Sequence, residues 1–481
     1  MYRMRINPHI FRGYDIRGLV DEDLNPEVAL NIGKAHGTYL KRLGHSKAVV
    51  GYDSRLTSPE YAQQVATGLI WSGLDVVDIG REMVGTFYWA QHFLKIPGGV
   101  YVSASHNPPE FNGFKLANDY SETLVSEGIQ EIRKLIEAED YEEGKQPGKV
   151  TKKSIRQDYF EDLLGRLKIE KKMKVVVDPS NTTAGEVVPP LLRDAGCEVI
   201  EYNTKVDSSF PLGVADPTEI HIMERLGKEV RGSRADVGFT YDADGDRVGI
   251  VDEKGQPIWN DVLLEIFAID VLRDHPGETI MYNALCSKAA PETILAYGGK
   301  PFMWRAGHSF LKKKNQEIKA AFIGELSGHF FFSKDFFNQD DGVYSTLRVL
   351  QAASRAGKPL SKVVSELPSY VSSPQIHISI ADDKKVELMQ RLAPELKEAF
   401  PDSKVIDDES VGDGIRAELP NGLFVVRYSQ NGPYIVIKIE ARTKKEYEDL
   451  RSHILSLLKK QPELDWDPTN KINVNISALT S

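Results

Sequence analysis

Cysteine is almost absent from this sequence. Only Cys197 and Cys286 occur among the 481 residues, and the distance between them fits no metal-binding spacing. We interpret both as buried thiols of a protein that works in a reducing compartment. The shortage argues against a secreted domain stabilised by disulfides.

Long apolar runs are missing as well. No stretch approaches the roughly 20 apolar residues that a membrane-spanning helix needs. The segment from Met1 to Ile6 also lacks the apolar region of a signal peptide. We therefore expect a cytoplasmic protein with no membrane partner.

Positive charge is not in excess. The 60 Lys and Arg residues against 70 Asp and Glu residues give a formal net charge of −10. This balance argues against a general nucleic-acid-binding protein, although it leaves room for a locally basic pocket. Hydrophobic residues make up 41% of the chain and charged residues 27%, as is typical of a folded globular protein.

The length and the order of the apolar patterns indicate several α/β domains. A chain of 481 residues exceeds what one core holds, so we expect three or four domains. Strand-like runs at 47–51, 74–79 and 98–102 alternate with helix-like segments at 26–43 and 58–73. This alternation predicts a parallel sheet covered by helices.

The same alternation of strands and helices occurs twice more along the chain. In each of the three units, the third strand is followed by a polar loop. The strands of these later units are expected at 174–178, 197–201, 235–241, 279–282, 301–304 and 320–323. From about Pro374 the pattern changes to strands followed by a terminal helix at 444–460. This change predicts a small α+β domain with an antiparallel sheet.

The first polar loop follows the apolar run 98–102. Two prolines stop that strand, and the carboxyl ends of strands in an open α/β sheet face the ligand crevice. Ser105 would therefore present its hydroxyl there, with His106 and Lys115 nearby. Taken alone, the segment also fits an ordinary polar turn.

The second loop carries three carboxylates at alternate positions, Asp242, Asp244 and Asp246. They can converge only if a cation offsets their repulsion, and a hard divalent cation such as Mg²⁺ does so. An EF-hand is excluded because Arg247 stands where that loop needs glycine and because the flanks resemble strands. A solvated acidic turn is the remaining alternative.

The third loop, residues 324–329, places Glu325 and Ser327 two residues apart, so both can point to one side of an extended segment. A carboxylate and a hydroxyl suit the hydroxyl groups of a sugar, although a structural turn also fits. His308, which follows a glycine after a strand, is either a proton carrier or a hydrogen-bonded structural histidine.

Two further segments could bind an anion. Arg17 lies in an early turn that carries two arginines. The segment 427–433 joins two strands of the last domain. It carries Arg427, Ser429 and Asn431, whose side chains suit a phosphate group. A simple loop and a simple hairpin turn are the respective alternatives.

Together these stretches resemble the α-D-phosphohexomutase family, of the phosphomannomutase/phosphoglucomutase type, over nearly the whole chain and in the family's order. The resemblance implies an α/β fold of four domains around a central cleft, in which three related mixed α/β units precede a smaller C-terminal α+β domain. We expect the phosphoserine loop in residues 1–152, the Mg²⁺ loop in 153–256, the sugar-specificity loop in 257–370 and the phosphate-binding loop in 371–481.

The resemblance also implies roles for single residues. Ser105 would carry the phosphoryl group and would share one Mg²⁺ with Asp242, Asp244 and Asp246. The other implied catalytic residues are His106, Lys115, Arg247 and His308. The implied substrate-binding residues are Arg17, Glu325, Ser327, His329, Arg427, Ser429 and Asn431. The sequence does not rank Lys115, His106 and His308 as proton carriers.

The implied activity is the interconversion of a hexose 1-phosphate and a hexose 6-phosphate, with mannose or glucose as the sugar. It would proceed through phosphoserine and a hexose 1,6-bisphosphate, which also serves as activator, in a monomer or weak homodimer that binds phosphosugars. One alternative is a phosphoglucosamine mutase, and Leu326 in the specificity loop argues against it by analogy with the family. The other is a non-catalytic sugar-phosphate-binding relative, against which the intact Ser105 and the three aspartates argue.

The chain departs from the family pattern at two places. Asn431 stands where threonine is usual, and an amide can still bind a phosphate oxygen. The segment 283–285 lacks a lysine that relatives often carry there, so one contact is either missing or supplied by Lys288.

Overall fold

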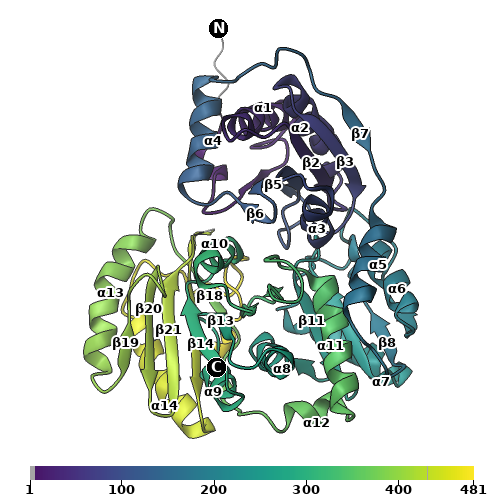
Figure 1. Cartoon of the computed structure of the whole chain (residues 1–481). Helices are drawn as coiled ribbons and strands as arrows, with labels where there is room; N and C mark the ends of the chain where they lie inside the picture. Colours follow the sequence, from purple (N-terminus) through teal and green to yellow (C-terminus); the bar gives the residue numbers. More distant parts are fainter. Residues whose placement is uncertain (1–5, 431, 481) are drawn as a thin grey trace.

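The structure is a computed structural model that describes residues 6–430 and 432–480 (Figure 1). One four-strand arrangement occurs three times in it. In the first unit, β2, β3, β4 and β5 lie in the order β3-β2-β4-β5, and the second and third units repeat it as β9-β8-β10-β11 and β14-β13-β15-β16. The recurring pattern seen in the sequence is therefore a repeated topology.

The first unit contains a short 3₁₀ helix, strands β1–β7 and helices α1–α4. Their bounds are η1 (Pro8–Ile10), β1 (Ile16–Leu19), α1 (Pro26–Arg42), β2 (Lys47–Tyr52), α2 (Ser58–Trp71), β3 (Asp75–Arg81), α3 (Val84–Leu94), β4 (Gly98–Val102), β5 (Phe111–Asp119), β6 (Glu122–Thr123), α4 (Glu127–Ala138) and β7 (Val150–Lys152). The sheet order is β1-β5-β4-β2-β3-β7, and β6 pairs with β5.

The second unit begins at α5, which lies beside the first unit (Figure 1). Its elements are α5 (Arg156–Arg166), β8 (Lys174–Val177), α6 (Ala184–Asp194), β9 (Glu198–Glu201), α7 (Ile220–Ser233), β10 (Val237–Tyr241), β11 (Val248–Asp252) and β12 (Pro257–Ile258). Because β12 pairs with β11, the second sheet runs to residue 258, two residues past the boundary that we expected at 256.

The third unit contains α8–α12 and a sheet of four strands, the smallest of the three repeated sheets. Its elements are α8 (Asn260–Asp274), β13 (Thr279–Asn283), α9 (Ala289–Ala296), β14 (Lys300–Trp304), α10 (His308–Ile318), β15 (Phe322–Gly324), β16 (Phe330–Phe331), α11 (Gly342–Ala356) and α12 (Leu360–Val364).

In each repeat the first three strands are parallel, as the sequence predicts, but the fourth is antiparallel. The sequence analysis did not place this fourth strand. The chain returns through a short loop, and a short loop can join only antiparallel neighbours. The polar loops therefore lie at the turn between the third and fourth strands of each unit.

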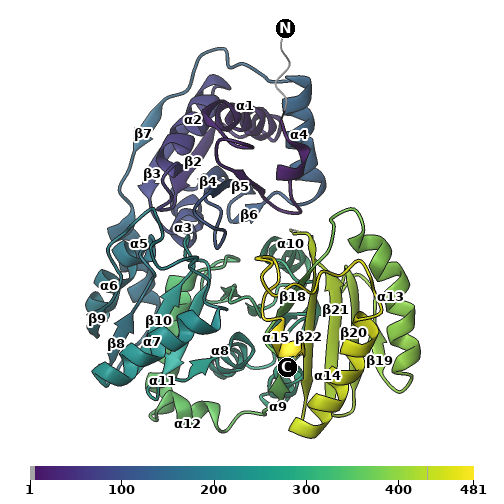
Figure 2. The same cartoon turned by 180° about the vertical axis from the view of Figure 1, so that it is seen from behind.

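The fourth unit has an entirely antiparallel sheet among its described strands, in the order β17-β22-β21-β20-β19, and β18 also pairs with β22 (Figure 2). Its elements are β17 (Val371–Ser372), β18 (Ile376–Ser379), α13 (Lys385–Ala399), β19 (Lys404–Ile406), β20 (Gly414–Leu419), β21 (Gly422–Tyr428), β22 (Tyr434–Ala441), α14 (Lys444–Leu458) and α15 (Ser477–Thr480). The predicted α/β fold with three related units and a smaller α+β unit is confirmed.

One hydrophobic core runs through the first three units and reaches the fourth. It joins Phe87 of α3, Val175 of β8 and Leu264 of α8, and it includes Val425 of β21. The fourth unit also has a core of its own between its sheet and α13 and α14. Fully burying one such side chain stabilises the fold by about 1.5–3 kcal/mol, so a shared core fixes the loops of different units relative to one another. Among the described helices, none is both long and apolar enough to cross a membrane.

Candidate active site

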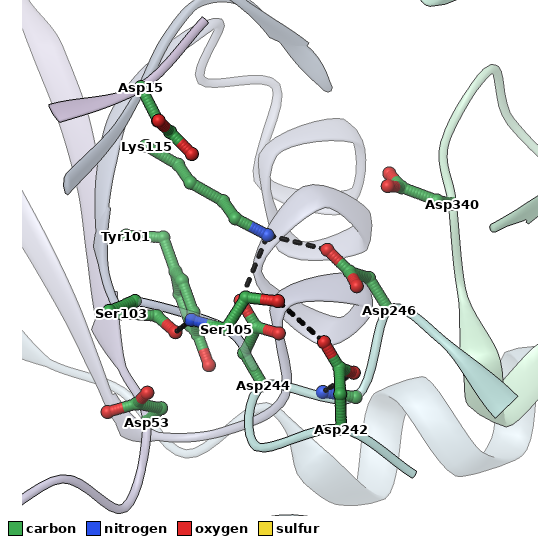
Figure 3. A network of polar contacts seen from close by, with 12 residues as sticks. Asp15, Asp53, Tyr101, Ser103, Ser105, Lys115, Asp242, Asp244, Asp246 and Asp340 are labelled. Carbon is green, nitrogen blue, oxygen red and sulfur yellow. Dashed lines mark hydrogen bonds and ion pairs between the residues drawn. The ribbon is translucent and has the colours of Figure 1, made fainter. Parts of the chain in front are cut away.

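Ser105 lies in the loop between β4 and β5 with its hydroxyl directed at the second unit (Figure 3). Its Oγ donates a hydrogen bond to Asp242 Oδ2 at 2.6 Å and lies 3.1 Å from His106 Nδ1. The residue is 2% exposed, and its φ of +49° is in the left-handed region. That conformation costs a non-glycine residue about 1–2 kcal/mol, so the surrounding loop must hold it.

The three aspartates occupy the corresponding loop between β10 and β11. Ligand oxygens of Asp242, Asp244 and Asp246 lie within 4.8 Å of one another, and all three residues are buried. The backbone N–H groups of Gly245 and Arg247 donate to Asp242 Oδ1, at 3.1 and 3.2 Å, and hold the loop closed.

Lys115 of β5 points towards these carboxylates (Figure 3). Its Nζ lies 2.5 Å from Asp246 Oδ2 and 2.9 Å from Asp244 Oδ2. Burial alone would lower the pKa of Lys115, but the two carboxylates outweigh burial and raise its pKa well above the ordinary value. Lys115 is therefore charged.

One lysine does not neutralise three buried carboxylates. Burial, and then repulsion from Asp246 and Asp244, raises the pKa of Asp242 well above its ordinary value. Asp244 Oδ1 is buried without a hydrogen-bond donor among the described residues. An all-oxygen donor set with excess negative charge and an unpaired oxygen fits a hard divalent cation such as Mg²⁺.

A second network surrounds Asp340, which precedes α11. His329 Nδ1 lies 2.9 Å and His308 Nδ1 3.2 Å from Asp340 Oδ2, while Lys312 Nζ donates to Oδ1 at 3.0 Å. The two imidazole rings stack with their centres 5.0 Å apart. Burial lowers the pKa of His308 despite the opposing effect of Asp340, so this ring is neutral near neutral pH.

Arg247 connects the two networks. Its Nε donates to His329 Nε2 at 3.1 Å. Because Nε2 accepts this bond, a ring proton of His329 is on Nδ1, which faces Asp340. His106 also tends to be neutral, because burial and then Arg247 and Arg17 lower its pKa well below the ordinary value.

The third loop lies between β15 and β16 and presents Glu325 and Ser327. Glu325 is 3% exposed, and its Oε1 accepts hydrogen bonds from the Gly307 N–H at 2.7 Å and from Asn283 Nδ2 at 3.0 Å. These bonds fix the orientation of the carboxylate. The buried Ser327 Oγ has no hydrogen-bond partner among the described residues, so it keeps its full bonding capacity.

Arg17 of β1 lies against the Ser105 loop. Its Nη1 donates to the Ala104 carbonyl at 3.3 Å and to Asn107 Oδ1 at 2.9 Å, and Asp15 pairs with the same guanidinium at 2.7 Å. Arg17 is therefore in contact with the loop that carries Ser105.

The fourth unit contributes Arg427 near the end of β21. Its Nη2 donates to Asp413 Oδ2 at 3.0 Å, and Arg305 of the third unit pairs with the same carboxylate at 3.2 Å. Burial, against an opposing effect of Asp216 and with smaller effects of Arg427 and Arg247, lowers the pKa of the nearby His377 to about 4.

Asn431, expected to bind substrate, lies outside the described residues. Lys288, the candidate substitute for the lysine that is missing ahead of Cys286, lies at the contact with the fourth unit. Its Nζ donates to the Leu419 carbonyl of the fourth unit at 2.6 Å, so in this structure it joins two units and is not directed at the aspartates.

The sequence analysis missed two buried cations, Lys312 and Arg55. Lys312 stands in a run of three lysines that resembles a solvated helix face, yet it lies one helical turn after His308 on the buried face of α10. The i, i+4 spacing from His308 was the available signal. Arg55 follows β2 in a loop with no motif of its own.

Three repeated α/β units whose equivalent loops present a buried serine, an acidic triad and a fixed carboxylate define an enzyme class with one multi-domain site. Profiles described as "Phosphoglucomutase/phosphomannomutase, alpha/beta/alpha domain" I, II and III match residues 8–143, 157–255 and 259–370. The chain therefore belongs to the phosphoglucomutase/phosphomannomutase family.

Individual relatives are similar to this chain over nearly its full length. The phosphomannomutase/phosphoglucomutase of Pseudomonas aeruginosa is 37% identical over 450 residues, which cover 94% of this chain and 95% of the relative. The phosphoglucomutase of Neisseria meningitidis serogroup A is 31% identical and covers 95% and 98%. A crystal structure of a family protein from Burkholderia thailandensis superposes with a TM-score of 0.88 at 32% identity, over 96% of this chain and 99% of that one.

Proposed function

We propose that the protein interconverts hexose 1-phosphates and hexose 6-phosphates, of glucose or mannose, through a phosphoserine at Ser105 and a hexose 1,6-bisphosphate. The observation that carries the proposal is the 2.6 Å hydrogen bond from Ser105 Oγ to Asp242, which puts a buried serine of one unit against the acidic triad of another. The relatives' names support the same reaction.

Asp242, Asp244 and Asp246 would hold one Mg²⁺ together with the phosphorylated Ser105. When bound, the ion offsets negative charge on the phosphoryl group. Lys115 and Arg247 supply fixed positive charge beside that group, and in phosphoryl transfer positioning and electrostatics provide most of the catalysis.

The sugar would lie between the third loop and the fourth unit. The carboxylate of Glu325, held by Gly307 and Asn283, would accept hydrogen bonds from hexose hydroxyls. The unpaired hydroxyl of Ser327 would donate to hexose hydroxyls or accept from them. Arg427, Ser429 and Asn431 would bind the phosphate that is not being transferred, and Arg17 and His329 would contact substrate from the other side. His106, Lys115 and His308 remain the candidates for proton transfer to and from the sugar.

The decisive experiment is the intact mass of the purified protein before and after incubation with glucose 1,6-bisphosphate and Mg²⁺, beside Ser105→Ala. We expect one added phosphate in the wild type and none in the variant, because no other residue occupies the position of Ser105. Absence of phosphate under every condition would exclude the phosphoserine mechanism and leave a sugar-phosphate-binding protein.

The substrate is decided by activity with glucose, mannose and glucosamine 1-phosphates. We expect turnover of the first two, and preference for the third would instead identify a phosphoglucosamine mutase. Sedimentation at several concentrations tests the expected monomer or weak homodimer.

A further inference from the structure

Arg55 is almost completely buried beside the Ser105 loop but makes no contact with the Ser105 hydroxyl. Its side chain is 1% exposed, and all four bonds from its terminal nitrogens go to backbone carbonyls. Nη2 donates to the carbonyls of Ser105 and Asn107, both at 2.6 Å. Nη1 donates to the carbonyls of Pro108 and Phe111, at 2.7 and 2.8 Å.

We propose that Arg55 is a positioning residue that holds Ser105 in its left-handed conformation, with the hydroxyl directed at the aspartates. The proposal rests on the function proposed above. A guanidinium presents planar donors in a fixed fork, and this fork spans both sides of the turn. Holding the carbonyl of Ser105 fixes the peptide that follows it, so the side chain cannot rotate away with the backbone.

Further contacts hold the guanidinium and the backbone beside it. Asp53 Oδ2 lies 3.3 Å from Arg55 Nε, and Asp53 Oδ1 accepts the Arg55 N–H at 3.0 Å. The ring of Phe210, from the second unit, lies 5.2 Å from the guanidinium carbon. Ser208 of the same segment donates to the Ser54 carbonyl at 2.7 Å. The arginine is therefore fixed between the loop and the neighbouring unit.

The repeated topology gives an internal comparison. In every repeat, an Asp or Asn at the end of the first strand accepts the N–H of the residue two positions later. These turns are Asp53 with Arg55, Asp178 with Ser180, and Asn283 with Leu285, at 3.0, 3.1 and 3.2 Å. The turn needs no arginine, because serine and leucine occupy the position in the other two units. Arginine occurs in the unit whose loop carries Ser105.

The test uses Arg55→Lys in the full-length enzyme, with Arg348→Lys as the matched control. Lysine keeps the charge but cannot reach four carbonyls from one nitrogen. Arg348 is equally buried, at 1% side-chain exposure, and pairs with Asp270 in the third unit, so its loss affects stability without touching the loop. We expect kcat of Arg55→Lys to fall about 100-fold, the scale of a 1 Å misplacement, with KM little changed. The control should lose thermal stability and keep its kcat.

Two readouts separate positioning from general destabilisation. Millimolar guanidinium should restore part of the kcat of Arg55→Ala and should do nothing for the control. Hydrogen exchange of the peptide covering 103–112 should rise in Arg55→Lys only, and this readout needs neither substrate nor a folded Ala variant.

The outcomes are distinguishable. A wild type without mutase turnover counts against the proposed function, and the exchange of 103–112 still decides the role of Arg55. An active wild type with a kcat within about threefold in Arg55→Lys, or unchanged exchange in 103–112, would overturn the positioning role.

Discussion

One carboxylate oxygen of Asp244 is buried with no donor among the described residues, while the other lies 2.9 Å from Lys115. Burying an unpaired charged oxygen is unfavourable, so a cation should gain binding energy from this atom. We expect Asp244→Asn to weaken Mg²⁺ binding on the order of tenfold or more, because affinity at such sites follows the number of charged ligands.

Calorimetric titration with Mg²⁺ measures this effect directly. Asp274→Asn is the control, since Asp274 pairs with Arg355 at the surface and lies outside the site. Equal Mg²⁺ affinity in wild type and Asp244→Asn would mean that the triad is not the metal site.

At the scale of residues, sequence reasoning was strongest where one short segment carried the whole signal. The alternate carboxylates at 242–246 predicted a cluster, and the structure brings those oxygens within 4.8 Å. Arg55 and Lys312 could not be predicted in this way, because their partners lie 50 and 28 residues away in the chain. A contact across that distance leaves no local spacing to read.

Helix α8 packs against α9 through a buried acid, and this contact makes stability depend on pH. Thr293 of α9 donates to Glu265 of α8, which is 1% exposed. Burial, against the opposing bond from Thr293, raises the pKa of Glu265 from 4.5 to about 8. Between these two values the folded state holds a proton that the unfolded state has lost, so the contribution to stability is complete below pH 4.5 and declines as pH rises towards 8.

Glu265→Gln should therefore match the wild type near pH 4 and exceed it by a few kcal/mol at pH 9, because glutamine imitates the protonated acid. Urea denaturation at both pH values measures the difference. Glu137→Gln, on the exposed face of α4, is the control and should change neither value. A difference that does not vary with pH would show that Glu265 is ionised in the fold.

Periodicity predicted part of the element order, and some of its omissions have a physical reason. Predicted strands such as β4 occur where the apolar pattern placed them, whereas the long strand β5 and the helices α3 and α11 were not predicted. Strands of two residues, such as β12 and β16, are too short to show alternation. The antiparallel fourth strand depends on loop length and pairing, which the pattern of one strand does not contain.

The whole molecule is held together at the contact between the third and fourth units by buried polar bonds. Arg416 of β20 is fully buried, and its Nη1 donates to the carbonyls of Ala284 and Cys286 at 2.9 and 2.7 Å. We expect Arg416→Leu to leave both carbonyls unpaired, at a cost of about 1–3 kcal/mol each. Since the fourth unit has its own core, it should then separate before the rest unfolds.

Differential scanning calorimetry tests this expectation, with two transitions expected for Arg416→Leu and closer coupling in the wild type. Arg391→Leu is the control, because Arg391 pairs with Glu463 inside the fourth unit. An unchanged transition in Arg416→Leu would mean that the apolar contacts alone couple the two units. Neither this contact nor the shared core was visible in the sequence, where only the resemblance to a family indicated how the units are arranged.

The distribution of the site over the units has a consequence for how the protein is made. Ser105, the aspartates, Glu325 and Arg427 come from four successive units, and no single unit holds two of these four groups. Under the proposed function, we expect a nascent or partly folded chain to show no turnover until the last unit has docked. The return of turnover after dilution from denaturant should then report the final docking step and not the folding of any one unit.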